Sequence, residues 1–177
     1  ATDFGDLHES LSKAGSGCAS SATRALFAGG RDDSSNNSRI DYVSIFSTGN
    51  ASDFGDLSSS RYTLGQLSSS TRAVFGGGGI GYMTLIDYVT IASTGNATGF
   101  GFLTGSKYEI CGVASPTRGL FAGSSAAAID YITIASTGSA SDFGDLVSSY
   151  TPRSPAAASN GTRAVFAGDH DFSYVNT

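Results

Sequence analysis

Short apolar runs, rich in β-branched and aromatic residues, follow one another along the whole chain with polar turns between them. TRAVF (71–75) and IDYVTI (86–91) typify these runs, and each is bounded by Gly or by Ser-Thr-Gly-Asn, which are turn signals. Within a run the apolar positions do not alternate cleanly with polar ones, as in strands that are covered on both faces. Helical periodicity is missing. The pattern therefore predicts an all-β fold in which sheets pack against sheets.

The runs belong to a four-fold repeat. One segment, typified by SSTRAVFGGG, occurs at 21–30, 69–78, 115–124 and 160–169. A second, typified by LIDYVTIASTGN, occurs at 39–50, 85–96 and 128–139, and DFSYVNT at 171–177 looks like a shortened fourth copy. The arginine of the first segment recurs as Arg24, Arg72, Arg118 and Arg163, at spacings of 48, 46 and 45 residues.

A period near 45 residues with four short strands per unit is typical of a β-propeller blade. One domain over residues 1–177 is therefore expected, with four four-stranded blades. The repeats run over about 1–50, 51–96, 97–139 and 140–177.

A third repeated segment, DFGDL, suggests how the blades close. It occurs within 1–7, 51–57 and 140–146, with a degraded copy at 97–103. The chain opens inside this strand and stops at the strand that precedes it in each repeat. The first strand is therefore expected to complete the last blade, which removes an exposed sheet edge. Completion in cis gives a closed ring, and completion in trans gives an open head-to-tail filament.

These segments resemble kelch repeats over nearly the whole chain. Gly pairs such as Gly77-Gly78 follow an apolar strand where kelch repeats carry theirs, and Tyr42, Tyr88 and Tyr131 stand where the kelch aromatic pair begins. Phenylalanines replace the tryptophan of the family, which this chain lacks. They are Phe4, Phe54, Phe100 and Phe143. The resemblance implies a kelch-like propeller of the kind seen in phage tail-fibre and surface proteins.

Charge limits the classes of partner. Charged residues make up only 14 % of the chain, the net charge is −5, and Lys and Arg form no cluster. Phosphate backbones and anionic lipids attract Lys and Arg, so nucleic acid and anionic membranes are not expected as partners. No apolar run approaches the roughly 20 residues that span a bilayer, so membrane insertion is not expected either.

Two motifs look catalytic. Asp-Phe-Gly holds magnesium in protein kinases, but here it recurs at equivalent repeat positions without the Gly-rich loop, lysine or catalytic loop of a kinase. GGGGIG (76–81) matches the dinucleotide fingerprint by letters, but a strand follows it where the phosphate needs a helix N-terminus. No Gly-x-Ser-x-Gly elbow is present, so the sequence predicts a protein that is not an enzyme and needs no cofactor.

The repeated charges admit two interpretations. The four arginines and Asp41, Asp87 and Asp130 form either a ring for an anionic ligand or a set of Arg–Asp or Arg–backbone bonds that stitch strands together. The second is favoured, because a planar guanidinium suits such bonds. Among the phenylalanines, Phe4, Phe54 and Phe143 belong to intact DFGDL copies and are expected to pack between blades.

Cysteine and asparagine also leave alternatives open. Cys18 and Cys111 lie at nearly matching repeat positions, so they either bridge two blades or remain as buried thiols. Four asparagines lie in Asn-x-Ser/Thr sequons, which either accept N-glycans or serve as turn residues. They are Asn36, Asn50, Asn96 and Asn160.

Specificity on a repeat scaffold belongs in the loops that vary. The repeats differ most between the Gly pair and the IDY strand, and again after DFGDL. Alternate turns of an antiparallel meander lie on the same side, so both loop sets are expected to share one face. Four tyrosines lie in or beside these loops and are candidates for stacking on a neutral sugar. They are Tyr62, Tyr82, Tyr108 and Tyr150.

One local group could hold a divalent ion, with carboxylates favouring calcium. If the blades close, His8 lies beside Asp169, His170 and Asp171. Solvated loop charges are the simpler interpretation of these residues.

Two functions follow as hypotheses. The first is a non-enzymatic structural or adhesive module of an extracellular or virion fibre, binding surface carbohydrate through the variable loops. The second is a self-assembling extracellular filament subunit, joined head-to-tail by strand exchange. Self-association is expected. The first hypothesis rests on the resemblance of the fold, which is an analogy.

Overall fold

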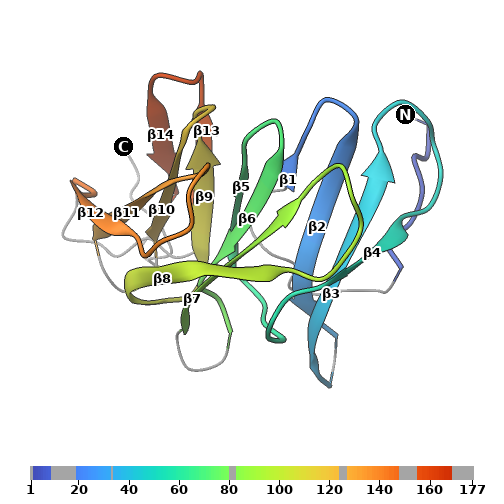
Figure 1. Ribbon diagram of the computed structural model, residues 1–177, viewed down its shortest axis with the longest axis horizontal. Coiled ribbons are helices and arrows are strands. Elements are labelled where there is room, and N and C mark those ends of the chain that lie inside the picture. Colours follow the sequence, from blue (N-terminus) through green and yellow to red (C-terminus); the bar gives the residue numbers. More distant parts are fainter. Residues whose placement is uncertain are drawn as a thin grey trace, which may run out of the picture.

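The computed structural model describes residues 2–8, 19–32, 34–79, 83–123, 127–147 and 155–168. These residues form fourteen strands and no helix, so the all-β prediction is confirmed (Figure 1). The strands form four sheets in which each strand pairs with the next along the chain, antiparallel throughout. Each sheet is therefore a simple meander.

The first three sheets have four strands each, and two strands of the fourth are described. The first sheet comprises β1 (Ala19–Ser20), β2 (Arg24–Arg31), β3 (Asn36–Ser44) and β4 (Ser52–Asp56). The second comprises β5 (Gly65–Ser68), β6 (Arg72–Gly76), β7 (Met83–Thr90) and β8 (Thr98–Lys107). The third comprises β9 (Ile110–Ala114), β10 (Arg118–Gly123), β11 (Ala128–Thr133) and β12 (Ser141–Asp145). The fourth contains β13 (Ala156–Ser159) and β14 (Ala164–Ala167).

The sheets stand beside one another in chain order. The opening strand of each sheet contacts that of the next, so β1 contacts β5, β5 contacts β9 and β9 contacts β13. In Figure 1, β3 and β4 lie at one end of the long axis, while β12, β13 and β14 lie at the other. The described strands thus form an open row of sheets with two opposite ends.

A β-bulge recurs at the Phe of the DFG segment. In the first sheet Ile40 pairs with Gly55 and Asp41 pairs with Asp53, which leaves Phe54 as the extra residue on β4. The same shift leaves Phe100 and Phe143 unpaired in the second and third sheets. A bulge re-aims the side chain that it carries. Each Phe meets a Tyr of the neighbouring strand edge-on, with ring centroids 5.9–6.2 Å apart.

The hydrophobic core lies between the sheets. One cluster joins the first and second sheets and includes Leu26, Ile40, Phe75 and Ile91. The other joins the second and third sheets and includes Val74, Phe100, Phe121 and Ile134. A middle sheet therefore buries both of its faces. This explains why apolar residues do not alternate along β6 and β7.

Candidate functional site

Neighbouring sheets meet through one repeated set of polar contacts, which we call the joint. Its first part is the arginine of the repeat. The Nη1 of Arg24 donates to the backbone oxygen of Ile91 in the next sheet at 3.0 Å, and Arg72 donates to that of Ile134 at 2.9 Å. Each guanidinium also lies 4.7 Å from the ring centroid of a Tyr in its own sheet. These arginines therefore link one sheet to the next.

The second part of the joint binds the DFG strand to the Ser-Thr-Gly turn of the next sheet. The backbone oxygens of Phe54 and Asp56 accept from the amides of Gly95 and Ala97, each at 2.7 Å. The side chain of Asn96 accepts from the Asp56 amide at 3.1 Å. Between the second and third sheets, Phe100 and Phe102 make the same backbone bonds.

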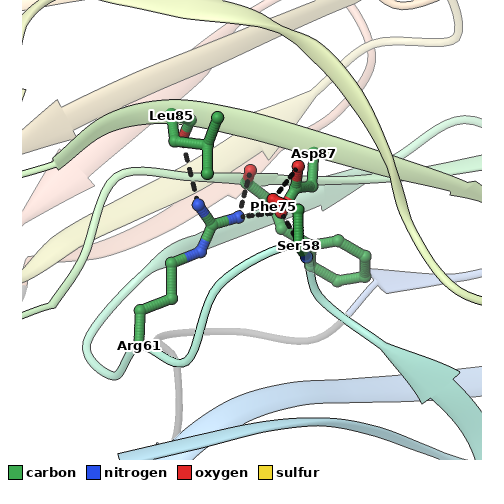
Figure 2. A network of polar contacts seen from close by, with 5 residues as sticks. All are labelled: Ser58, Arg61, Phe75, Leu85 and Asp87. Carbon is green, nitrogen blue, oxygen red and sulfur yellow. Dashed lines mark hydrogen bonds and ion pairs between the residues drawn. The ribbon is translucent and has the colours of Figure 1, made fainter.

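The third part is a buried carboxylate. Asp87 lies on β7, pairs with Arg61 at 2.9 Å, and both side chains are fully buried. Figure 2 shows that Ser58 donates to the same carboxylate, and that Arg61 also reaches the backbone oxygens of Phe75 and Leu85. Burial lowers the pKa of the Arg61 guanidinium below its ordinary value, while the negative charge of Asp87 opposes that shift.

The same arrangement recurs one sheet along. Asp130 is buried on β11, pairs with Lys107 at 3.4 Å and accepts from the amide and hydroxyl of Thr104. Lys107 also donates to the backbone oxygen of Ala128. At this repeat position the cation, Arg61 or Lys107, is therefore buried and paired with the aspartate of the third strand.

Sequence reasoning missed these two cations, because they lie in segments that look like variable loops. A signal was present: Arg61 and Lys107 each stand eight residues after the first residue of their own DFG segment, Asp53 and Gly99. Each also precedes a Tyr.

Residues 2–8 repeat the contact of a DFG strand, against the first sheet. The backbone oxygens of Phe4 and Asp6 accept from the amides of Gly49 and Ala51 at 2.7 and 2.8 Å. The amide of His8 donates to the buried Asp41 at 3.1 Å, as the amide of Ser58 does to Asp87. This segment therefore occupies the place of a fourth strand that would belong to a preceding sheet.

The two ends of the row expose residues whose repeat equivalents are buried. At the first sheet, Ile45 is 45 % exposed, whereas Ile91 and Ile134 are each 1 % exposed. At the fourth sheet, Val165 is 64 % exposed, whereas Val74 is fully buried, and Val165 lines the cleft described in the next paragraph. Phe4, which was expected between blades, is also exposed, in contrast to Phe54 and Phe100. Phe143, for which the same was expected, is exposed on β12 of the third sheet, beside that cleft. The first sheet thus presents half of a joint.

A cleft of about 700 Å³ lies between the third and fourth sheets. Arg118, Arg163 and Phe143 line it together with residues of β10 and β14. The guanidinium of Arg118 lies 5.2 Å from the ring centroid of Tyr131, as Arg24 and Arg72 lie over Tyr42 and Tyr88. The cleft therefore occupies the position of a joint.

The described parts of the loops that vary between repeats are hydrogen-bonded to one another, and we call this part of the molecule the variable edge. It comprises residues 29–32, 57–64, 77–79 and 107–109. The amide of Gly30 donates to the backbone oxygen of Arg61, and the amide of Gly79 donates to the backbone oxygen of Tyr62. The Gly78 amide likewise donates to Lys107.

Two of the four candidate tyrosines fall within the described residues. Tyr62 is half-buried on the variable edge, with the Arg31 guanidinium 5.6 Å from its ring centroid. Tyr108 is also half-buried, beside β8. Tyr82 and Tyr150 lie outside the described residues. The variable edge thus presents at least one aromatic ring next to a cation.

Only one member of the proposed calcium group, His8, lies within the described residues. His8 is exposed, while Asp169, His170 and Asp171 lie outside the described residues. In the ranges that the structure does describe, no three His, Cys, Asp or Glu side chains gather as metal ligands would.

Three of the four sequon asparagines serve as hydrogen-bond acceptors. Asn50 accepts from the Asp6 amide, as Asn96 does from Asp56. Asn160 accepts from the amides of Thr162 and Arg163, while Asn36 begins β3. Three of the four sequons thus have a structural use.

Cys111 is a buried free thiol on β9, and Cys18 lies outside the described residues. Burial raises the pKa of the Cys111 thiol to about 11, which disfavours the reactive thiolate.

No helix in the described part of the chain is long and apolar enough to cross a membrane. The chain matches no protein-family model and no curated protein.

Proposed function

We propose that the chain is a non-enzymatic structural and adhesive module of an extracellular or virion fibre, built from kelch-like propeller blades. The observation that carries this proposal is that the repeated residues and the variable residues lie in different parts of the structure. Repeated residues such as Arg72, Asp87 and Asp130 are engaged in the joints, while the loops that differ between repeats gather on the variable edge. Such a division suits a fixed scaffold that presents a changeable surface.

The ligand proposed for the variable edge is a neutral surface carbohydrate. An aromatic ring supplies an apolar face for a sugar, and polar groups beside it supply hydrogen bonds. Tyr62 with Arg31 offers such a pair, next to the backbone of Gly79. The low content of charged residues suits a ligand without charge.

A glycan array tests this function. Purified wild-type chain is expected to bind a restricted set of neutral glycans, and Tyr62→Ala is expected to reduce that binding at least tenfold. Thr94→Ala, on the exposed Ser-Thr-Gly-Asn turn of the opposite edge, serves as the matched control and is expected to bind like wild type. Absence of glycan binding, or equal loss in both variants, would contradict the carbohydrate proposal.

A second candidate function is a self-assembling filament subunit. The exposed half-joint at the first sheet favours it, because large exposed apolar side chains such as those of Ile45 and Phe46 mark interaction surfaces. Residues 2–8 favour it as well, since they already take the place of a fourth strand for another sheet. In this proposal the first strand of one copy completes the last blade of its neighbour. The same contact within one chain would close a four-bladed ring.

A further inference from the structure

Two of the sheets contain the same buried site for a cation, which we call the ion-pair site. In the second sheet, Arg61 binds the carboxylate of Asp87 and donates to the backbone oxygen of Leu85, two residues before that aspartate (Figure 2). The third sheet repeats both contacts with an ammonium group. Its residues are Lys107, Asp130 and Ala128. The site thus consists of a buried carboxylate and a backbone oxygen of the same strand, and it accepts either kind of basic side chain.

The first sheet contains the same aspartate. Asp41 is 3 % exposed and pairs with Phe27 across β2 and β3, as Asp87 pairs with Phe75. Its Oδ2 accepts from the His8 amide, whereas its Oδ1 is buried and has no hydrogen-bond partner among the described residues. Buried charges in proteins are paired or bind an ion. The first sheet therefore requires a cation at this site as well.

The cation beside Asp41 on its own strand points elsewhere. Arg39 stands two residues before Asp41, and its guanidinium lies 3.9 Å from the exposed Asp53. Among the described side chains, no ion pair joins Arg39 to Asp41. The backbone oxygen of Arg39 nevertheless stands where those of Leu85 and Ala128 stand, so both acceptors of the ion-pair site are present.

The register of the sequence identifies the cation. In the second and third sheets, it stands eleven residues before the repeated arginine. These pairs are Arg61 with Arg72, and Lys107 with Arg118. Lys13 stands eleven residues before Arg24, the repeated arginine of the first sheet. The count therefore gives the first sheet a basic residue at the same position.

The strand pairing supports this count. In each sheet one residue of the opening strand pairs with the residue two after the repeated arginine, and it lies six residues after the basic residue. These paired residues are Ala19, Leu67 and Val113. The spacing from Lys13 to β1 is thus the same as in the other sheets. The two extra residues of the first repeat lie before Lys13, which stands ten residues after Asp3.

We propose that Lys13 is the cation of the ion-pair site in the first sheet, with its ammonium group bound to Asp41 and to the backbone oxygen of Arg39. Lys13 itself lies outside the described residues. The contact holds residues 2–8, which already bond to the first sheet through their backbone, at the end that leads to Lys13. Any sheet that pairs with residues 2–8 then meets a strand that is already fixed. Neither of the functions proposed above requires this contact.

A double-mutant cycle tests the pairing by urea unfolding. Lys13→Met removes the charge and is expected to raise the equilibrium constant for unfolding about a hundredfold, because Asp41 is left buried without a counter-charge. In the Asp41→Asn background, the same substitution is expected to raise it less than about threefold, because the partner is already gone. Lys13→Arg is expected to unfold like wild type, since the second sheet binds a guanidinium in the same place.

Asp53→Asn provides the matched background. Asp53 is an exposed carboxylate that pairs with Arg39. In this background Lys13→Met is expected to keep its full effect, because the effects of residues that share no contact add.

Chemical rescue gives a second readout that does not depend on the stability of any one variant. Propylammonium chloride is expected to raise the melting temperature of Lys13→Gly, or to refold it if it is unfolded by itself. Tetramethylammonium chloride at the same ionic strength is expected to have no such effect, because it has no N–H group to donate. Neither salt is expected to rescue Asp41→Asn.

Two results would overturn the proposal. If the effects of Lys13→Met and Asp41→Asn simply add, or if Lys13→Met unfolds like wild type, Lys13 does not bind Asp41. If propylammonium fails to rescue Lys13→Gly, while sodium or calcium chloride stabilises wild type but not Asp41→Asn, the site binds an inorganic cation instead.

Discussion

Gly55 of the first sheet lies so close to Gly95 of the second that a Cβ atom on Gly55 would stand 2.5 Å from the Gly95 backbone oxygen. The contact exists because the DFG strand docks its backbone directly on the next Ser-Thr-Gly turn. Gly101 meets Gly138 in the same way one sheet along, whereas nothing lies within 4 Å of that position on Gly144. The three glycines occupy the same repeat position, so substituting them compares a glycine that contacts the next sheet with one that does not.

Gly55→Ala is expected to destabilise the fold considerably more than Gly144→Ala. Both glycines have positive φ, +144° and +134°, so both substitutions incur backbone strain of about 1–3 kcal/mol. Only Gly55→Ala adds a backbone clash, which costs a further 1–3 kcal/mol or so. Urea unfolding measures the free energy of unfolding of the two variants. Equal decreases would show that the joint accommodates the added methyl group without cost.

Asp87→Asn is expected to cost about 3–5 kcal/mol, because it leaves the fully buried Arg61 without its counter-charge. Asp53→Asn is the control, since the Arg39–Asp53 pair is 3.9 Å apart and Asp53 is 59 % exposed. An exposed pair contributes at most about 1 kcal/mol. Chemical denaturation compares the two, and similar costs would contradict a dry, structural role for Arg61 and Asp87.

Arg72→Gln is expected to cost about 2 kcal/mol, since a hydrogen bond from a charged donor contributes roughly 1.5–3 kcal/mol. That donor bonds the Ile134 backbone oxygen, and the substitution also removes the contact with Tyr88. Arg118→Gln is the matched variant. Arg118 is exposed beside the cleft, so its loss is expected to cost less than about 1 kcal/mol. Thermal unfolding of both variants measures the two costs. Equal costs would contradict the idea that Arg72 stabilises the fold through its bond to the next sheet.

The Asp32 carboxyl gives a prediction about pH. Its pKa is lowered to about 2, chiefly because the amides of Ser34 and Ser35 donate to it. A lowered pKa in the folded state means that these bonds contribute fully above about pH 3.8 and are lost as the pH falls through 2. Amide shifts of Ser34 and Ser35 are expected to titrate near pH 2 in wild type and to stay flat in Asp32→Asn. A midpoint near 3.8 would contradict the turn geometry.

Much of the architecture was accessible from local sequence. The runs TRAVF and IDYVTI, which are followed by Gly and by a Ser-Thr-Gly-Asn turn, overlap most of β6 and β7. The missing alternation in these runs correctly indicated strands with two buried faces, because a middle sheet has a neighbour on each side. The repetition of DFGDL pointed to a structural motif, and the structure makes its Phe the residue of a β-bulge.

The joints required the tertiary structure. Arg72 finds its acceptor 62 residues away, on a backbone oxygen that no side chain marks in the sequence. By sequence Arg61 looks like a solvated loop cation. Its burial depends on its contact with Asp87 of β7, which only the tertiary structure shows. Ile45, Ile91 and Ile134 are alike by sequence, and only their place in the row decides that one is exposed. The repeat thus determined what each sheet is made of, whereas the order of the sheets in space decided which copies are joined and which faces remain open.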